Sequence, residues 1–99
     1  MKVVWSPLAL EVIRQESRYI AAHDRRAARK WIEDLFAVVH QLADFPDSGR
    51  NVPELQDRKI REIFHGGYRV IYRVEAQQVS ILTVRHSRRH LSSDDLDDR

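Results

Sequence analysis

The chain has 99 residues, of which 42% are hydrophobic and 32% charged, and its formal net charge is +2. These values indicate one small globular domain over residues 1–99, and no apolar run approaches the roughly 20 residues that cross a bilayer, so we expect a cytoplasmic protein without membrane contact. Because the sequence contains no cysteine, it excludes a disulfide framework, a thiolate nucleophile and a thiolate metal site.

The first half of the chain predicts a strand followed by two helices. The apolar run Lys2–Trp5 suits a strand, and Ser6-Pro7 is a strong helix start, because the hydroxyl can cap and proline is tolerated in the first turn. Apolar residues at helical spacing then continue to about Ala22. Asp24 can cap a second helix, whose apolar stripe is Ala28, Trp31, Ile32, Leu35, Val38, Val39 and Leu42. The short connection requires an αα-hairpin.

The second half predicts an antiparallel meander. A turn-rich loop at residues 45–49 is followed by three strand candidates, Arg58–His65, Tyr68–Glu75 and Val79 to Val84 or slightly beyond. Gly66-Gly67 is a two-residue hairpin signal. We therefore expect an α+β fold of the order β-αα-βββ, with the helical hairpin covering one face of the sheet.

The two-glycine loop also predicts a register. It opposes His65 to Tyr68, Phe64 to Arg69, Glu62 to Ile71 and Ile60 to Arg73. Glu62, Arg69 and Arg73 then share one face of the sheet. Arg61 lies on the other face with Tyr68, Val70 and Tyr72, although a one-residue bulge in the loop would reverse this assignment.

Positive charge is concentrated on the predicted strands and just after the last one. The candidate target-binding or phosphate-binding residues are Arg61, Arg69, Arg73, Arg85, Arg88 and Arg89. Such a surface can bind phosphates through paired guanidinium hydrogen bonds. The alternative is that Glu62, Glu75 and neighbouring side chains neutralise the arginines across the strands. An acidic segment, DDLDDR, ends the sequence, and we expect residues 92–99 to form a frayed tail.

His86, at the end of the last predicted strand, is a candidate acid or base. With Glu54 and Arg69 as companions it would supply a proton donor, a carboxylate and a cation, the minimum set for metal-free RNA cleavage. The alternative is a hydrogen-bonded histidine at a strand end. His86 and His90 lie four residues apart without nearby carboxylates other than the tail, so we expect neither a metal nor another cofactor.

The order of these motifs resembles that of the RelE/ParE toxin superfamily. The resemblance covers about residues 2–91 and rests on GRNVPEL, RKIRE, YRVIYRV and VSILTVRHSRR, which follow a helical hairpin and a strand ending in Trp5-Ser6. It implies the same β-αα-βββ fold and the toxic half of a bacterial type II toxin–antitoxin pair. RelE-like members are ribosome-dependent mRNA endoribonucleases, whereas ParE-like members inhibit DNA gyrase.

The resemblance leaves both targets open and favours the ParE-like one slightly. In the nuclease branch, Arg69 and Arg89 match phosphate-contacting arginines, while Glu54 would be the base and His86 the acid. However, Ile60 and Glu62 replace the lysine pair of RelE-like second strands, and no tyrosine follows Tyr72 to provide the C-terminal aromatic residue. These departures remove a base-stacking group and add negative charge where a scissile phosphate would bind.

Both branches imply a protein partner. The resemblance predicts a cognate antitoxin, ParD-like or RelB-like, whose acidic C-terminal segment folds onto the toxin, with an apolar groove beside the helical hairpin and the basic sheet surface as docking sites. The expected target is DNA gyrase or the ribosome with its mRNA. A non-toxic binding module is the remote alternative.

Overall fold

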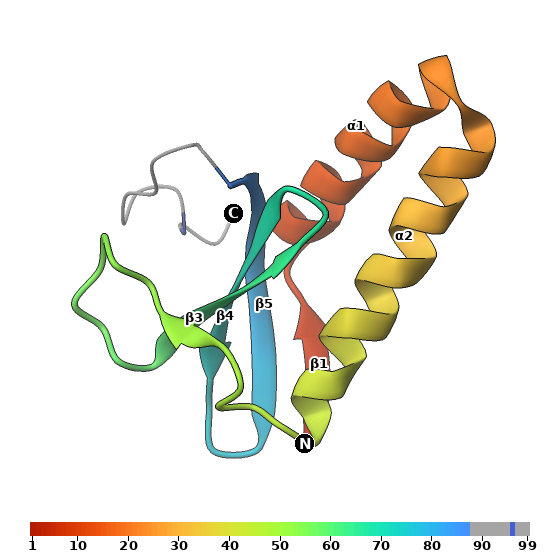
Figure 1. Cartoon of the computed structure of the whole chain (residues 1–99). Helices are drawn as coiled ribbons and strands as arrows, with labels where there is room; N and C mark the ends of the chain where they lie inside the picture. Colours follow the sequence, from red (N-terminus) through yellow and green to blue (C-terminus); the bar gives the residue numbers. More distant parts are fainter. Residues whose placement is uncertain (88–95, 97–99) are drawn as a thin grey trace.

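The computed structural model describes residues 1–87 and residue 96. The chain begins with strand β1 (Lys2–Trp5) and continues into helices α1 (Pro7–His23) and α2 (Arg25–His40), which are followed by a short 3₁₀ turn η1 (Gln41–Ala43). Four strands complete the order, namely β2 (Arg50–Asn51), β3 (Ile60–His65), β4 (Tyr68–Val74) and β5 (Gln78–His86). The two helices form an antiparallel hairpin beside the sheet (Figure 1).

The two helices begin where the sequence places their caps. Ser6 Oγ accepts a hydrogen bond from the Ala9 amide at 3.0 Å, and Pro7 occupies the first position of α1, where no amide hydrogen is needed. Asp24 caps α2 by accepting from the backbone amides of residues 26 and 27. The capping residue between the helices is thus also the whole connection, which confirms the αα-hairpin.

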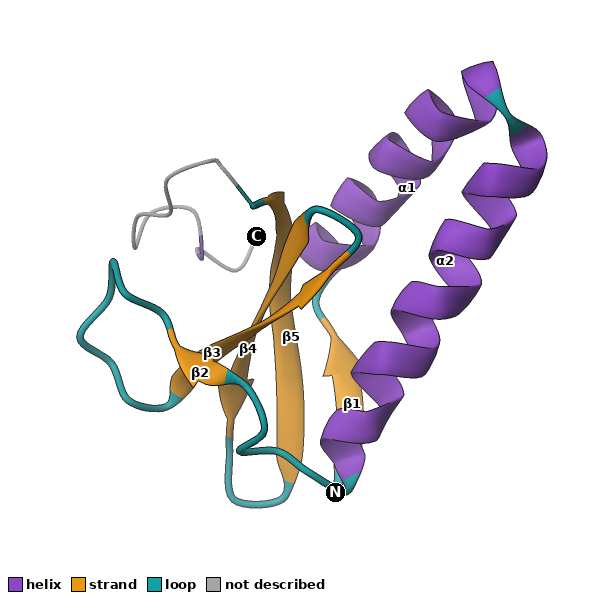
Figure 2. Ribbon diagram, in the orientation of Figure 1, coloured by secondary structure: helices purple, strands orange, loops and turns teal. Residues whose placement is uncertain are grey.

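The strands form one mixed sheet in the order β1-β5-β4-β3-β2 (Figure 2). β1 pairs in parallel with β5, while the other neighbours are antiparallel. The register between β3 and β4 opposes His65 to Tyr68 and Ile60 to Arg73, which confirms the prediction from the two-glycine loop. Gly66 and Gly67 both have positive φ, the conformation that a two-residue hairpin turn requires and glycine readily adopts.

The pairing between β4 and β5 contains a one-residue irregularity that the sequence did not predict. Tyr72 opposes Ile81 but Ile71 opposes Thr83, so Leu82 is the extra residue of a bulge. Because successive strand residues alternate faces, one extra residue reverses the alternation beyond it. The bulge therefore decides which face of the sheet the end of β5 presents.

Apolar residues pack on both faces of the sheet. Under the helices, the core combines Leu35 and Val39 of α2 with Val70, Tyr72 and Ile81 of the sheet. The opposite face carries a smaller cluster that consists of Val52, Ile60, Ile71 and Leu82, against which Leu55 and Leu96 pack. The helices thus cover one face, as expected, and the segment between β2 and β3 contributes to covering the other.

Most boundaries differ from the predicted ones by one or two residues, and one strand is new. β3 begins at Ile60 instead of Arg58, because a turn in which the Ile60 amide bonds to the Asp57 carbonyl precedes it. β5 extends slightly beyond Val84, to His86, as the prediction allowed. The two-residue β2 forms a sheet edge between the predicted loop and the first predicted strand of the meander, where no strand was predicted. Arg88, Arg89 and the predicted tail lie outside the described residues, apart from Leu96.

Candidate functional site

The sheet face opposite the helices carries a cluster of four charged side chains, of which Glu62 and Arg69 are buried. β3 and β4 place Glu62 and Arg69 diagonally across from each other on this face, two residues apart in the register. β2 places Arg50 directly opposite Glu62. Glu54 joins them from the segment that follows β2, and we call Arg50, Glu54, Glu62 and Arg69 the ion-pair cluster.

Arg69 is held by two carboxylates at once. Its Nε donates to Glu62 Oε1 at 2.6 Å, and its two terminal nitrogens donate to the two oxygens of Glu54 at 2.8 Å each. Arg69 is 5% exposed and Glu62 1% exposed. The hydrogen bonds from Glu54 raise the pKa of Arg69 most, burial opposes them, and the hydrogen bond to Glu62 raises the pKa further. Arg69 is thus a buried cation with matched counter-charges.

Arg50 completes the cluster from the edge of the sheet. Its Nε donates to the second oxygen of Glu62 at 2.7 Å, so both Glu62 oxygens accept from an arginine. The Arg50 guanidinium also lies 5.1 Å from the centre of the Phe64 ring, which is 51% exposed. Arg50 and Phe64 were not among the predicted site residues. The signal that marked Arg50 was its place in the GRNVPEL motif, but a two-residue strand gives no periodicity that predicts its pairing.

The loop before β2 is fixed by Tyr72, which positions Arg50. The Tyr72 hydroxyl donates to the Pro46 carbonyl at 2.8 Å and accepts from the Gly49 amide at 2.9 Å, and burial raises its pKa. A Cβ at Gly49 would lie 2.5 Å from both the Glu62 carbonyl oxygen and the Tyr72 hydroxyl. The close approach of these backbones therefore requires glycine.

His86 lies on the other face of the sheet from the ion-pair cluster. It opposes Tyr68 in the register, while Arg85 opposes Arg69. Its ring meets the Tyr68 ring edge-on with centroids 5.7 Å apart, on the side of the helices. The structure therefore brings Glu54 and Arg69 together but separates His86 from both by the sheet.

The remaining predicted arginines are dispersed. Arg61 lies on the helix side opposite Tyr72, as the loop predicted, and its Nη1 donates to the Gly49 carbonyl at 2.7 Å. Arg73 shares the face of the ion-pair cluster and lines a separate hollow of about 270 Å³ with Glu75 and Ser80. Arg85 also lies on that face, whereas Arg88 and Arg89 fall outside the described residues.

Tyr68 forms a second polar contact under the helices. Its hydroxyl donates to Glu16 at 2.7 Å, and its ring packs against Trp31 with centroids 5.2 Å apart. Burial, and then the hydrogen bond to Glu16, raise the pKa of Tyr68 to about 12. The sequence marks Tyr68 only as the register partner of His65, because its contact with Glu16 spans 52 residues and leaves no local pattern.

A hollow of about 690 Å³ lies between β1 and α2. Its apolar lining includes Val3, Trp5, Phe36 and Ala37, and the rings of Trp5 and Phe36 lie 4.7 Å apart. β1 is an outer strand of the sheet, so its outer backbone groups are available for another strand. This hollow corresponds to the apolar groove expected beside the helical hairpin.

Two features of the described residues bear on ligands and membranes. In residues 1–87 and at residue 96, no three histidine or acidic side chains are grouped so that they could hold a metal ion. Over the same residues, neither helix has the length and apolar character that crossing a membrane requires.

Comparison with known proteins identifies one family. The sequence matches the model of the ParE toxin of the type II toxin–antitoxin system parDE over residues 3–91. The fold resembles a chain of the chromosomal ParDE system from P. aeruginosa, with a TM-score of 0.71 and 18% identity over 87% of this chain and 95% of that one. It also resembles a chain of the RelBE2 toxin–antitoxin complex from Mycobacterium tuberculosis, with a TM-score of 0.56 and 20% identity over 86% and 95%. No curated protein matches the sequence significantly.

Proposed function

The chain belongs to the family of ParE toxins from type II toxin–antitoxin systems, whose model matches residues 3–91, and we propose that its target is DNA gyrase. As a member of this family, the chain is the toxin of a type II toxin–antitoxin pair. ParE-like toxins inhibit gyrase, and RelE-like relatives cut mRNA on the ribosome, so the two targets call for different surfaces.

The proposal rests mainly on one observation, that both Glu54 and Glu62 accept hydrogen bonds from the Arg69 guanidinium. In a ribonuclease of this superfamily this arginine would bind the scissile phosphate. Here it must first release Glu54, which means losing two charge-assisted hydrogen bonds worth about 1.5–3 kcal/mol each. Buried Glu62 would also repel an incoming phosphate at the same place. Both effects favour a structural role for Arg69.

The position of His86 supports the same proposal. A general acid must lie within about 2.6–3.2 Å of the atom that it protonates, or one water away. Because His86 is on the helix side and Glu54 is on the opposite face, the two cannot act on one ribose without a rearrangement of β5. A gyrase inhibitor needs no such pair.

The alternative, an mRNA endoribonuclease, has one specific observation in its favour. Glu54 and Arg69 are in contact, and the half-exposed Phe64 lies on the same face, where it offers an aromatic surface for base stacking. In that function Glu54 would be the base, His86 the acid, and Arg69 and Arg89 the phosphate ligands. Further contacts would come from Arg61, Arg73, Arg85 and Arg88.

The neutralising partner would be an antitoxin with an acidic, amphipathic C-terminal segment. We propose that this segment occupies the hollow between β1 and α2. Its apolar side chains would contact Trp5 and Phe36, its backbone would pair with the outer edge of β1, and its carboxylates would lie near Lys2 and the N-terminal amine. Phe36→Ser should then weaken antitoxin binding more than the same change at exposed Phe45, which lies outside this hollow.

Two assays test the target. With purified gyrase, the toxin should inhibit supercoiling or trap the cleaved DNA complex, and a lack of both at excess toxin would reject the proposal. In a coupled translation extract, full-length mRNA should persist, whereas cuts at codons in the ribosome would establish the nuclease. Expression without any effect on growth would instead support the non-toxic binding module.

Variants of single residues separate the two functions further. His86→Gln should leave toxicity unchanged if gyrase is the target, and should abolish mRNA cleavage if His86 is the acid. Exposed His23 is the matched control, because it lies at the end of α1, away from both faces of the sheet. His86→Gln could lose toxicity without a change in its unfolding free energy, while His23→Gln stays toxic. In that case His86 takes part in the toxic activity, and its proposed lack of a functional role is wrong.

A further inference from the structure

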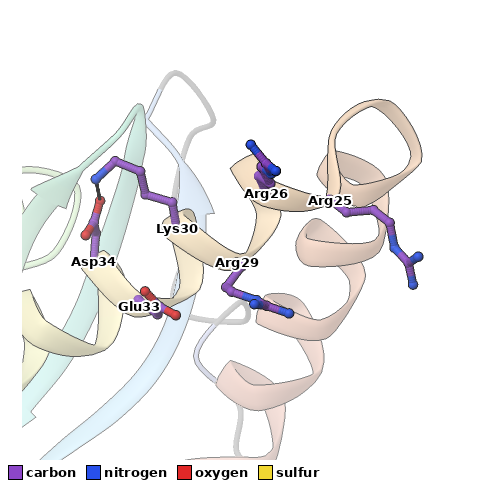
Figure 3. A pocket seen from close by; sticks show the side chains of 6 residues that line it. All are labelled: Arg25, Arg26, Arg29, Lys30, Glu33 and Asp34. Atoms are coloured by element: carbon purple, nitrogen blue, oxygen red, sulfur yellow. Dashed lines mark hydrogen bonds and ion pairs between the residues drawn. The ribbon is translucent and has the colours of Figure 1, made fainter.

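The end of the helical hairpin carries a group of exposed arginines that the proposed function does not use. Arg25, Arg26 and Arg29 lie in the first two turns of α2, and we call them the arginine patch. With Lys30, Glu33 and Asp34 they line an open hollow of about 510 Å³ (Figure 3). The side chains of Arg25 and Arg26 extend in different directions, and that of Arg29 extends toward α1 (Figure 3).

The charges of the patch are not neutralised within the part of the chain that the structure describes. Over residues 1–87 and 96, none of its three guanidinium groups makes an ion pair or a side-chain hydrogen bond, whereas neighbouring Lys30 pairs with Asp34 at 2.9 Å. Asp24 is the nearest acidic residue in sequence, and its Oδ1 accepts from two backbone amides. The guanidinium donors therefore face solvent, in contrast to buried Arg69.

The shape of the hairpin end suits a large, extended anion. The connection between the helices projects well beyond the sheet, so the patch lies on a protruding surface instead of in a cleft (Figure 1). All six side chains that line its hollow are charged. An adjoining hollow between the helices contains Ala28 and Ile32, but Ala28 is 5% exposed and Ile32 packs against the core.

We propose that the arginine patch binds the phosphate backbone of double-stranded nucleic acid without reading its sequence. A protruding surface whose lining side chains are all charged, four of them cationic, can contact successive phosphates along a rod-shaped polyanion. An acidic protein segment is the less suitable partner, because no apolar side chain lines this hollow for it to pack against. The inference goes beyond the proposed gyrase inhibition and does not require it.

Fluorescence anisotropy with a labelled 20-base-pair duplex and the purified full chain tests the proposal. Three phosphate contacts predict that the slope of log affinity against log salt is steeper by about 2.7 in the wild type than in a triple glutamine variant of the patch. Raising the salt from 50 to 200 mM should therefore lower the affinity of the wild type by about 40-fold more than that of the triple variant. Each single Arg→Gln change should reduce the slope by about 0.9.

A matched control separates the patch from net charge. Glutamine at Arg14, Arg58 and Lys59 removes three exposed positive charges elsewhere on the surface. This variant should keep a slope close to that of the wild type, and circular dichroism should show that both triple variants are folded. Equal losses in the two variants, or no binding by the wild type at 50 mM salt, would overturn the proposal.

A competition experiment excludes the other partner. A 20-residue polyglutamate should displace the duplex only at concentrations well above those at which unlabelled duplex competes. If polyglutamate competes equally well and its binding depends on the patch, the surface recognises acidic polypeptide and the proposal is wrong. Because no gyrase is present in these measurements, they can reject nucleic-acid binding by the arginine patch without bearing on gyrase inhibition, which the supercoiling assay tests.

Discussion

Replacing Glu62 by glutamine tests whether the ion-pair cluster is a structural element. The side chain of Glu62 has 0% exposure, and its two oxygens accept from Arg69 at 2.6 Å and from Arg50 at 2.7 Å. Glutamine preserves the shape of the side chain but offers one oxygen and one NH₂ group. One of the two arginines must therefore lose its acceptor.

The structure sets the magnitude of this effect. Arg50 is 60% exposed and can turn its guanidinium into water, so losing its contact costs little. The remaining contact with Arg69 changes from a charged to a neutral acceptor, and a hydrogen bond to a charged group is worth about 1.5–3 kcal/mol. Glu54 still neutralises Arg69. We expect a loss of about 2 kcal/mol, below the roughly 3–5 kcal/mol for an unpaired buried charge.

Urea unfolding followed by circular dichroism at pH 7 measures the change. A loss of about 2 kcal/mol corresponds to a fall in Tm of about 8–16 °C for a domain of this size. Exposed Glu33 is the matched control, and Glu33→Gln should change the unfolding free energy by less than about 0.5 kcal/mol. A similarly small effect for Glu62→Gln, or additivity of Glu62→Gln with Arg69→Gln within about 0.5 kcal/mol, would refute the reasoning.

Three further changes test other contacts. Because the pKa of Tyr68 is raised in the folded state, the unfolded state loses the phenol proton first as the pH rises. The contribution of Tyr68 to stability should therefore decline from pH 10 to about 12. Tyr68→Phe should flatten the corresponding fall in the urea midpoint. Gly49→Ala should destabilise the fold by about 1–3 kcal/mol in the same assay, because its Cβ would lie 2.5 Å from the Tyr72 hydroxyl; an effect below that of exposed Asp44→Ala would contradict this. Ser6→Ala should cost about 1–2 kcal/mol, and Ser6→Thr, which retains the capping oxygen, should recover most of it.

Local chemistry determined the elements and part of the register. Ser6 and Asp24 are helix caps because their side-chain oxygens satisfy amides within three residues, which requires no knowledge of the tertiary fold. The pairing of β3 with β4 followed from Gly66-Gly67, since a two-residue loop leaves one register. From this register alone, Glu62 and Arg69 could be placed on the same face.

The candidate site could be predicted only in pieces. Glu54 comes from an irregular segment, so its contact with Arg69 depends on how β2 pairs with β3. The sequence predicts, as one alternative, that Glu62 neutralises an arginine. It does not predict that Glu62 is buried, because the packing of residues 52–55 on that face is a tertiary property. Arg50 and Phe64 entered the site for the same reason.

The sequence by itself determined an α+β fold of the order β-αα-βββ with a cation-rich meander, because caps, periodicity and tight turns act over a few residues. Only the tertiary structure decided that His86 and Arg69 lie on opposite faces. Strict alternation from Ile81 would place His86 on the face of Arg69, but the extra residue Leu82 reverses it. The Leu82 carbonyl accepts from the Ser6 hydroxyl at 2.8 Å, a contact across 76 residues. A bulge held by so distant a partner leaves no local signal, and it decides which side chains can act together.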